Sequence, residues 1–507
     1  MIGIWILGDR LTTQQLSLLN NQDLKEQTSV ILIESHNYVR QRPYHRQKLV
    51  LVWSAMRHFA QELREAGWQV TYEIATDFAT PLTKWIAAHQ ITTLQMTTPC
   101  DRPFLRHIQS LDLNCDLELL PDQHFLWSGE EFVAWSNSRK RMLMEDFYRE
   151  GRKRFQILME GQKPMGGKWN YDQENRKPPK KNLQTPKPLI FEPDEITQEV
   201  IDWVKQEQFS AYGYLEPFHW GVTREQAEQV LAYFIDHCLP QFGTYQDAMI
   251  TEEYTMWHSL ISPYLNLGLL EPRSVIEAIE QAYHQHDLPL NSVEGFIRQV
   301  MGWREYMHGI YFSQNQLDDQ YGENNWFNHH RPLPKFYWDA AKTEMNCLHQ
   351  TLTQVEETAY GHHIQRLMVL NNFALIAGVN PQELENWFHS AFIDAYDWVM
   401  QTNVLGMGQF ADGGLLASKP YAASANYINK MSDYCGDCKY NKSDRTGEQA
   451  CPFNFFYWDF LLRHGDRLKS LGRMNLVLSH IKRLPEAEIA AIKALADQWW
   501  SAELRES

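Results

Sequence analysis

The sequence predicts an α/β domain with a parallel sheet in its first part and a large all-α domain in its second part. Short runs of β-branched and aromatic residues alternate with amphipathic stretches up to about residue 135. From about residue 195 onward, apolar residues recur at helical spacing, without the alternation that is typical of strands. Strands that are separated by helices build parallel sheets, which is why we expect the first domain to be α/β.

Four β-rich runs are predicted strands: IGIWILG (2–8), SVILIES (29–35), QVTYEIA (69–75) and TLQMTTP (93–99). The segment Arg46–Ala66 is a predicted helix that ends at Gly67, a typical helix stop. Ligands of parallel sheets bind at the carboxyl ends of the strands. Gly8, Asp9 and Glu34 lie at such ends and are candidates for a pocket rim, although ordinary loop residues would look the same. No GxGxxG follows the first strand, so a standard dinucleotide site is not indicated.

A stretch rich in Pro, Gly and Lys at 162–194 separates the two parts of the chain. Its length and composition are typical of an exposed connector that can serve as a functional loop. We therefore divide the chain into an α/β domain (1–135), a connector (136–194) and a helical domain (195–507).

Composition and charge limit the class of protein. Of the 507 residues, 44% are hydrophobic and 22% are charged, which indicates large buried cores rather than disorder. No apolar run is long enough to span a membrane, and Asp9 and Arg10 interrupt the first run too early for a signal peptide. We therefore expect a cytoplasmic protein with no membrane partner.

The net charge of −16 argues against a general nucleic-acid binder, but basic residues cluster in and before the connector. They are Arg139, Lys140, Arg141, Arg149, Arg152, Lys153, Arg154, Arg176, Lys177, Lys180, Lys181 and Lys187. Such a strip can contact phosphates. A solvated helix face followed by a basic linker is the simpler interpretation of the same residues.

Four of the seven cysteines form a pattern. Cys435 and Cys438 make a CxxC, Cys451 follows and precedes a proline, and Cys347 lies far upstream. Four thiolates bind either zinc or an iron–sulfur cluster. The single CxxC favours the cluster, because zinc ribbons pair two such units, but zinc and chance clustering remain alternatives. The other three cysteines are expected to be small buried side chains, since an odd count in a chain without a signal peptide argues against disulfides.

Three further segments make the chain resemble a known family. They are HSLISPYLNLGLL (258–270), EGFIRQVMGWREYMHGIY (294–311) and AYGHHIQRLMVLNNF (359–373). Together with the four cysteines they resemble the photolyase/cryptochrome superfamily, and within it the bacterial iron–sulfur group of photolyase-related proteins. The resemblance covers essentially the whole chain.

This resemblance implies cofactors and an activity. It implies FAD in the helical domain, a [4Fe-4S] cluster, and an antenna in the α/β domain such as 6,7-dimethyl-8-ribityllumazine. It also implies a (6-4) DNA photolyase, a lyase that acts on UV-damaged DNA, and we expect a monomer. A blue-light photoreceptor of the cryptochrome type is the main alternative. A cluster-bearing DNA-binding module is a third possibility, against which the flavin-pocket segments count.

The resemblance also implies roles for individual residues. The cofactor-binding residues are His258, Ser259, Ser262, Arg304, His363, Arg366 and Asp394. Taken alone, the two serines are equally typical of a helix cap, and Arg304 of a structural salt bridge. The pair His362 and His363 resembles the one that distinguishes (6-4) enzymes from cyclobutane-dimer enzymes. Histidine suits proton transfer because its pKa lies near neutrality. We assign His363 to the side of the flavin and lesion and His362 as the proton donor.

The remaining assignments follow from the same resemblance. Trp338, Trp387 and Tyr427 are expected electron-transfer residues, and Asp172, Arg176 and Tyr421 expected contacts to the lesion or DNA. Gly8, Asp9 and Glu34 are the expected antenna-binding residues, with a contribution from His45. The expected cluster ligands are Cys347, Cys435, Cys438 and Cys451. Met400 falls where many relatives carry a polar residue that faces flavin N5, which puts the protonation chemistry there in question.

Overall fold

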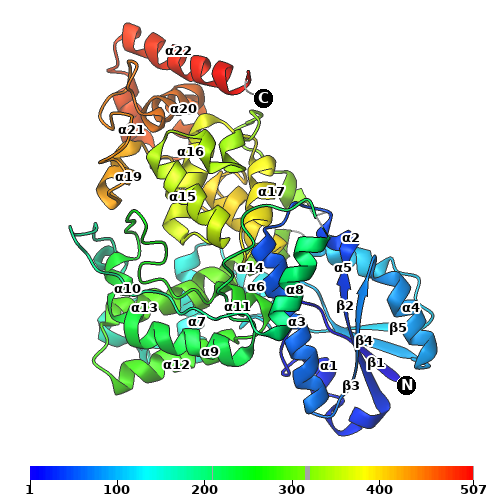
Figure 1. Ribbon diagram of the computed structural model, residues 1–507. Helices are drawn as coiled ribbons and strands as arrows, with labels where there is room; N and C mark the ends of the chain where they lie inside the picture. The colour runs from blue at the N-terminus through cyan, green and yellow to red at the C-terminus, as the bar shows by residue number, and fades with distance from the viewer. Residues whose placement is uncertain (208, 315–319, 506–507) are drawn as a thin grey trace.

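The computed structural model describes residues 1–207, 209–314 and 320–505 (Figure 1). An α/β domain with one parallel sheet precedes a larger helical region, as the sequence predicts. In Figure 1 the blue sheet domain and the red C-terminal helices lie at opposite ends of the molecule. Among the described residues, no helix is long and apolar enough to cross a membrane.

The sheet has five parallel strands in the order β3-β2-β1-β4-β5. They are β1 (Ile2–Trp5), β2 (Thr28–Ser35), β3 (Gln69–Ala75), β4 (Thr93–Thr97) and β5 (Asp116–Leu120). The four predicted strands are therefore confirmed, and β5 is an addition. The first and fourth end before the predicted last residues, because the chain turns away from the sheet there.

Alternate side chains of the central strands pack on opposite faces of the sheet. Ile4 and Val30 pack with the long helix α3 (Arg46–Glu65) in one core cluster. Trp5 and Ile31 pack in another cluster, with α4 (Ala79–Ala88) and α5 (Arg102–Gln109). Both faces are thus covered, which explains why these strands are continuously apolar. The short helices α1 (Leu16–Leu19) and α2 (His36–Val39) complete the domain.

The connector region joins the two domains through packing as well as through the chain. Helices α6 (Gly129–Asn137) and α7 (Met144–Phe155) share an aromatic cluster with α14 (Glu305–Gln314) of the helical domain. The expected boundary at residue 135 falls inside α6. After α7, the chain forms the small hairpin β6 (Met159–Glu160) and β7 (Lys163–Pro164), followed by mostly irregular backbone.

The helical region starts with α8 (Glu195–Gln206), which packs on α3 of the α/β domain. The remaining helices are α9 (Arg224–Tyr233), α10 (Leu239–Tyr245), α11 (Ser262–Leu267), α12 (Pro272–Gln285), α13 (Leu290–Ile297), α15 (Asn346–Thr358), α16 (Asn372–Ala377), α17 (Pro381–Ala391), α18 (Asp397–Met400), α19 (Ala425–Met431), α20 (Pro452–Lys469), α21 (Asn475–Ile481) and α22 (Glu486–Glu503). π-Helical turns occur at Phe234–Cys238, Arg298–Arg304, Gln365–Asn371 and Gln401–Gly408. Such turns are frequent at functional sites.

Candidate functional site

The centre of the candidate site is a largely buried ion pair between Arg366 and Asp394. Nη1 and Nη2 of Arg366 donate to the two carboxylate oxygens of Asp394 at 2.9 and 3.1 Å. The hydroxyl of Ser262 donates to the same carboxylate at 2.7 Å. Burial alone would raise the pKa of Asp394, but the arginine and the hydroxyl lower it below its ordinary value. The carboxylate is therefore ionised at neutral pH and fixes the arginine.

The loop that carries Asp394 is held from two sides. Asn266 of α11 donates to the main-chain oxygen of Asp394 at 2.8 Å. Lys48, from α3 of the other domain, donates to the main-chain oxygen of Ala395 at 2.5 Å. The ion pair thus lies on a loop that both domains position.

Two histidines stack beside this ion pair. The rings of His258 and His362 lie 4.4 Å apart at an angle of 9°. Within the described part of the chain, Nε2 of His258 and both ring nitrogens of His362 are buried without a hydrogen-bond partner. Burial lowers the pKa of His258 to about 3 and that of His362 well below its ordinary value, so both rings are neutral. Buried polar atoms in native proteins are rarely left unpartnered, and these nitrogens therefore fit a polar ligand.

The neighbouring His363 differs from His362 in its access to solvent. Its side chain is exposed, whereas His362 is only 2% exposed. The protein that surrounds it on several sides still lowers its pKa to about 4, and the charge of Arg366 contributes. Of the two histidines, the one that exchanges protons readily with its surroundings is therefore His363, the reverse of the order expected from the sequence.

Arg304 lies apart from this site. Its guanidinium donates to Glu305 at 2.9 Å and to the main-chain oxygen of His124 at 3.3 Å, and it stacks on Phe125 at 4.3 Å. These contacts join the start of α14 to the loop after β5. The expected flavin contact is thus not supported, and the structural salt bridge is the interpretation that fits.

The residues expected to contact the lesion do come together. Arg176 pairs with Asp172, and it lies 4.0 Å from the carboxylate of Asp247. The hydroxyl of Tyr427 donates to Asp247 at 3.4 Å, and Tyr421 is close enough for the charges of Arg176 and Asp172 to act on its pKa. Tyr427, expected in the electron relay, therefore belongs to this group.

Of the two tryptophans of the expected relay, Trp387 lies in a series of ring contacts that begins at the ion pair. Arg366 stacks on Phe392 at 4.2 Å, and the ring of Phe392 lies 5.7 Å from that of Trp387. Trp387 is fully buried and contacts Tyr337 at 5.0 Å. Tyr337 precedes Trp338, which is only partly buried. These contacts lead from the ion pair to Tyr337, whose neighbour in the chain, Trp338, is the more exposed of the two tryptophans.

The four cysteines of the pattern converge at one place in the helical region. Cys347 lies at the start of α15, Cys435 and Cys438 lie in the loop after α19, and Cys451 directly precedes α20. Burial raises the pKa of the Cys347 thiol, and the other three thiols raise it further. Burial also raises the pKa of Cys435 to about 11 and that of Cys451 to about 12. A positively charged centre would stabilise the thiolates that this environment disfavours.

A cavity lies at the carboxyl ends of β1 and β2, against the helical region. Gly8 and Asp9 line it, together with Lys48, Asp101 and Tyr396. A Cβ atom on Gly8 would lie 2.9 Å from Sδ of Met56, which is why the strand end carries glycine.

Two residues expected at this cavity lie outside its lining. Glu34 pairs with Arg57 at 2.9 Å and accepts a hydrogen bond from Tyr72 at 2.5 Å. His45 caps α3, because its Nδ1 accepts from the main chain of Gln47 at 3.2 Å. Both side chains are therefore structural.

Much of the basic strip is neutralised by the protein itself. Arg152 is 1% exposed and donates to main-chain oxygens, among them that of Trp169 at 2.9 Å. Arg149 and Arg154 pair with acidic residues of α7 and α6. This part of the strip fits the simpler interpretation, a helix face with its own ion pairs.

Comparison with known proteins assigns the chain to a family. The family model for deoxyribodipyrimidine photo-lyase-related proteins matches residues 4–220. A (6-4) photolyase from Agrobacterium fabrum is 44% identical over 479 residues, which is 93% of each chain. The chain belongs to the photolyase-related protein family.

Solved structures agree with this fold. A bacterial class III photolyase from Agrobacterium tumefaciens has a TM-score of 0.63 at 16% identity, over 92% of this chain and 98% of that one. A cryptochrome from Synechocystis sp. PCC6803 has a TM-score of 0.55 at 14% identity, over 88% and 90% of the two chains.

Reasoning from the sequence missed one acidic residue at the site of this photolyase-related protein. Burial raises the pKa of Asp247 to about 6, although Arg176 lowers it. The sequence around Asp247, two residues after Tyr245, contains no motif that marks it as a site residue. Its proximity to Arg176 and Tyr427 depends on tertiary structure, which sequence spacing does not report.

Proposed function

We propose that this photolyase-related protein is a (6-4) DNA photolyase, which uses light to repair (6-4) pyrimidine photoproducts in UV-damaged DNA. The observation that carries the proposal is the 44% identity to a (6-4) photolyase over 93% of the chain. The meeting of the Arg366–Asp394 pair with three histidines supports it. Bound FAD in its reduced form supplies the electron that the lesion receives on illumination.

The residues present fit FAD. The unpartnered nitrogens of His258 and His362 require a polar partner. Ser262 is the first residue of α11 and Ser259 lies three residues earlier, where small side chains and main-chain N–H groups suit a pyrophosphate. The charge of Arg366, fixed by Asp394, favours the electron-rich form of a flavin beside it.

The damaged nucleotides have to leave the base stack to reach this site. Arg176 suits a phosphate contact because its side chain is 60% exposed. Tyr421 and Tyr427 offer rings for stacking on a displaced base. We therefore assign this group to the lesion.

We assign the proton transfer to His363 because of its exposed position. Repair requires a proton as a hydroxyl group moves from one base to the other. In the protein alone, His363 is neutral at pH 7, since its pKa is lowered to about 4. A DNA phosphate beside the ring raises that pKa and favours the protonated donor. His362, which stacks on His258, then holds the neighbouring His363 in position.

The four cysteines fit an iron–sulfur cluster better than zinc. A tetrahedral zinc ion with bonds of about 2.3 Å brings its sulfur ligands within about 3.8 Å of one another. No three of these four described sulfur atoms lie within 4.8 Å of one another. A [4Fe-4S] cluster, in which each thiolate binds a different iron, accommodates the wider spacing.

The cavity with Gly8 and Asp9 is the proposed antenna site. Its aromatic lining, which includes Trp53, Phe78 and Tyr396, suits the flat ring of a lumazine. The carboxyl groups of Asp9 and Asp101 and the amino group of Lys48 suit the hydroxyls of a ribityl chain.

The function is tested by measuring the repair of oligonucleotides that carry a single (6-4) or cyclobutane lesion. We expect light-dependent loss of the (6-4) lesion alone. His363→Asn should lower the repair rate by about 100-fold or more, the usual contribution of a general acid, while flavin absorption is retained. The exposed His284→Gln is the matched control and should repair like the wild type. A flavin-bearing protein that repairs neither lesion would instead be a photoreceptor of the cryptochrome type.

The cluster is tested through Cys438. The Cys438→Ala variant should lose iron and the broad absorption of the cluster, because one of its four ligands is missing. Cys115→Ala, a cysteine of the α/β domain, is the control and should keep its iron. Unchanged iron in purified Cys438→Ala would contradict the assignment.

A further inference from the structure

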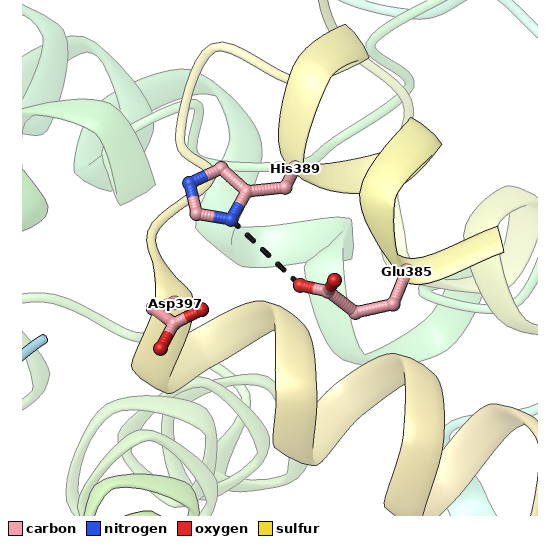
Figure 2. A group of neighbouring side chains, drawn as sticks. All are labelled: Glu385, His389 and Asp397. Atoms are coloured by element: carbon pink, nitrogen blue, oxygen red, sulfur yellow. Dashed lines mark ion pairs between the residues drawn. The ribbon is translucent and has the colours of Figure 1, made fainter. Parts of the chain in front are cut away.

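A second group of metal-ligand side chains lies outside the site described above. Figure 2 shows Glu385 and His389 of α17 pointing toward Asp397, the first residue of α18. One ligand atom of each lies within 4.8 Å of the others. Nδ1 of His389 is 3.7 Å from a carboxylate oxygen of Glu385, one helical turn earlier. The group thus joins two helices around a common point.

Two of these ligand atoms are buried and lack a hydrogen-bond partner. His389 is 5% exposed and Glu385 is 9% exposed. Among the described residues, neither Nδ1 of His389 nor Oε1 of Glu385 has a hydrogen-bond partner. Leaving such atoms without a hydrogen bond is unfavourable, and more so for charged groups. Their shared orientation toward one point indicates a missing partner at that point.

The third side chain is already oriented by its neighbours. The hydroxyl of Tyr311 donates to Oδ2 of Asp397 at 2.7 Å, and the amide of Gln401 donates to the same oxygen at 3.2 Å. Both bonds leave Oδ1 as an available ligand. Outer hydrogen bonds of this kind are what hold a carboxylate in place at metal centres.

Acidic side chains outnumber basic ones around the group. Asp101 adds a further, partly buried carboxyl group, which accepts from the main chain of Asp397 at 3.3 Å, while Arg42 and Lys48 are the nearby cations. Burial raises the pKa of Glu385 to about 7 and that of Asp101 to about 8, so these cations do not offset the loss of hydration. A bound cation would offset it.

We propose that Glu385, His389 and Asp397 bind one divalent transition-metal ion. One imidazole nitrogen and two carboxylate oxygens form a set that zinc, manganese and iron(II) accept. Metal–ligand bonds of about 2.0–2.2 Å in tetrahedral geometry separate neighbouring ligand atoms by about 3.4 Å, close to the separation of His389 and Glu385. The cavity at the strand ends, which His389 also lines, provides an entry route.

The ion would act on the fold of the flavin site. Residues 392–396, between α17 and α18, carry Asp394. A metal that links Glu385 and His389 to Asp397 ties the two ends of this segment together and limits its movement. The proposal itself does not depend on the repair activity.

Zinc binding by the complete protein tests the proposal. The purified protein is freed of loosely bound metal, incubated with zinc chloride and dialysed, and zinc and iron per chain are then counted by mass spectrometry. We expect the wild type to retain one zinc ion that His389→Gln and Glu385→Gln both lose. His58→Gln is the matched control: His58 lies 2.9 Å from the carboxylate of Asp194, but no third ligand joins them among the described residues, and this variant should retain zinc.

Flavin absorption and iron content show that the variants are folded. Glu385→Asp, which keeps a carboxylate, provides a further folded variant that should regain part of the binding. Any zinc bound by the four cysteines would be present in the same amount in every variant, so it would not account for a difference between them. The proposal is overturned if the wild type retains no zinc, or if His389→Gln and Glu385→Gln retain as much as the wild type.

Discussion

At the scale of the residue, the carboxylate of Asp394 receives three hydrogen bonds, two from Arg366 and one from Ser262, where little water enters. Charge-assisted bonds with this bidentate geometry are stronger than neutral ones. Removal of the negative charge leaves the arginine buried without its counter-charge, which costs more than the loss of a single bond.

The Asp394→Asn variant should therefore lose about 3–5 kcal/mol of the free energy of unfolding, the usual cost of breaking a buried pair. Ser262→Ala removes one hydrogen bond and keeps the pair, so its loss should be about 1 kcal/mol. Urea denaturation at neutral pH measures both values. Equal losses in the two variants would contradict the dominant role of the ion pair.

The candidate site was predictable from sequence in its main members but not in their arrangement. Arg366, Asp394 and the two histidines were named from the family motifs, and they do meet. The motif around Arg304 did not reveal that Glu305 and His124 engage its guanidinium. Likewise, the motif did not reveal that the adjacent His362 and His363 differ in burial, His362 just before a helical turn and His363 at its start.

At the scale of the element, α14 and α6 pack so closely that a glycine is required between them. A Cβ atom on Gly309 of α14 would lie 2.1 Å from the ring of Phe132 of α6. Gly465, inside α20, has no atom within 4 Å of its Cβ position. The two glycines therefore respond to the same substitution in opposite ways.

We expect Gly309→Ala to lower the free energy of unfolding by about 1–3 kcal/mol, because the aromatic cluster has to move to admit the methyl group. Gly465→Ala should raise it by up to about 1 kcal/mol, since alanine favours the helix. Thermal unfolding of the two variants beside the wild type gives the comparison. A loss of stability in both would show that α20 is as closely packed as α14.

Three of the strands that sequence patterns predicted, β1, β2 and β4, lie inside the sheet, and the fourth, β3, is an edge strand rich in β-branched and aromatic residues. β5 was missed because DLELL at the sheet edge is short and half charged, so it lacks the usual signal. The pairing of Glu385 and His389 is visible in the sequence as a spacing of four on one helix. Asp397, however, lies beyond a turn of the chain, and only the fold reveals that it joins them.

At the scale of the whole molecule, many histidines are held in the neutral form. Burial lowers the pKa of nine of them below its ordinary value: His45, His124, His258, His308, His329, His362, His363, His389 and His464. In the unfolded chain, these side chains take up protons near pH 6.5. The folded protein takes them up only at lower pH.

Acid should therefore destabilise the protein below pH 6.5. The unfolded state binds more protons there, so stability falls as the pH decreases toward the folded-state pKa values. For His308, whose pKa is lowered to about 3, the expected slope is about 1.4 kcal/mol per pH unit. His308→Gln should remove that part of the slope, as measured by urea denaturation at several pH values.

The exposed His284→Gln is the control and should leave the slope as it is in the wild type. If His308→Gln also left the slope unchanged, the ring of His308 would have to be protonated in the folded protein.

The central position of β1 in the sheet affects synthesis. Its two neighbours, β2 and β4, come from later parts of the chain, and β4 ends only at Thr97. At a translation rate of about 5–20 residues per second, β1 waits for several seconds with one edge open after β2 has formed. An open apolar edge is a template for pairing with other nascent chains. The yield of active protein in a cell thus depends on how the first hundred residues are shielded at the ribosome, however stable the finished molecule is.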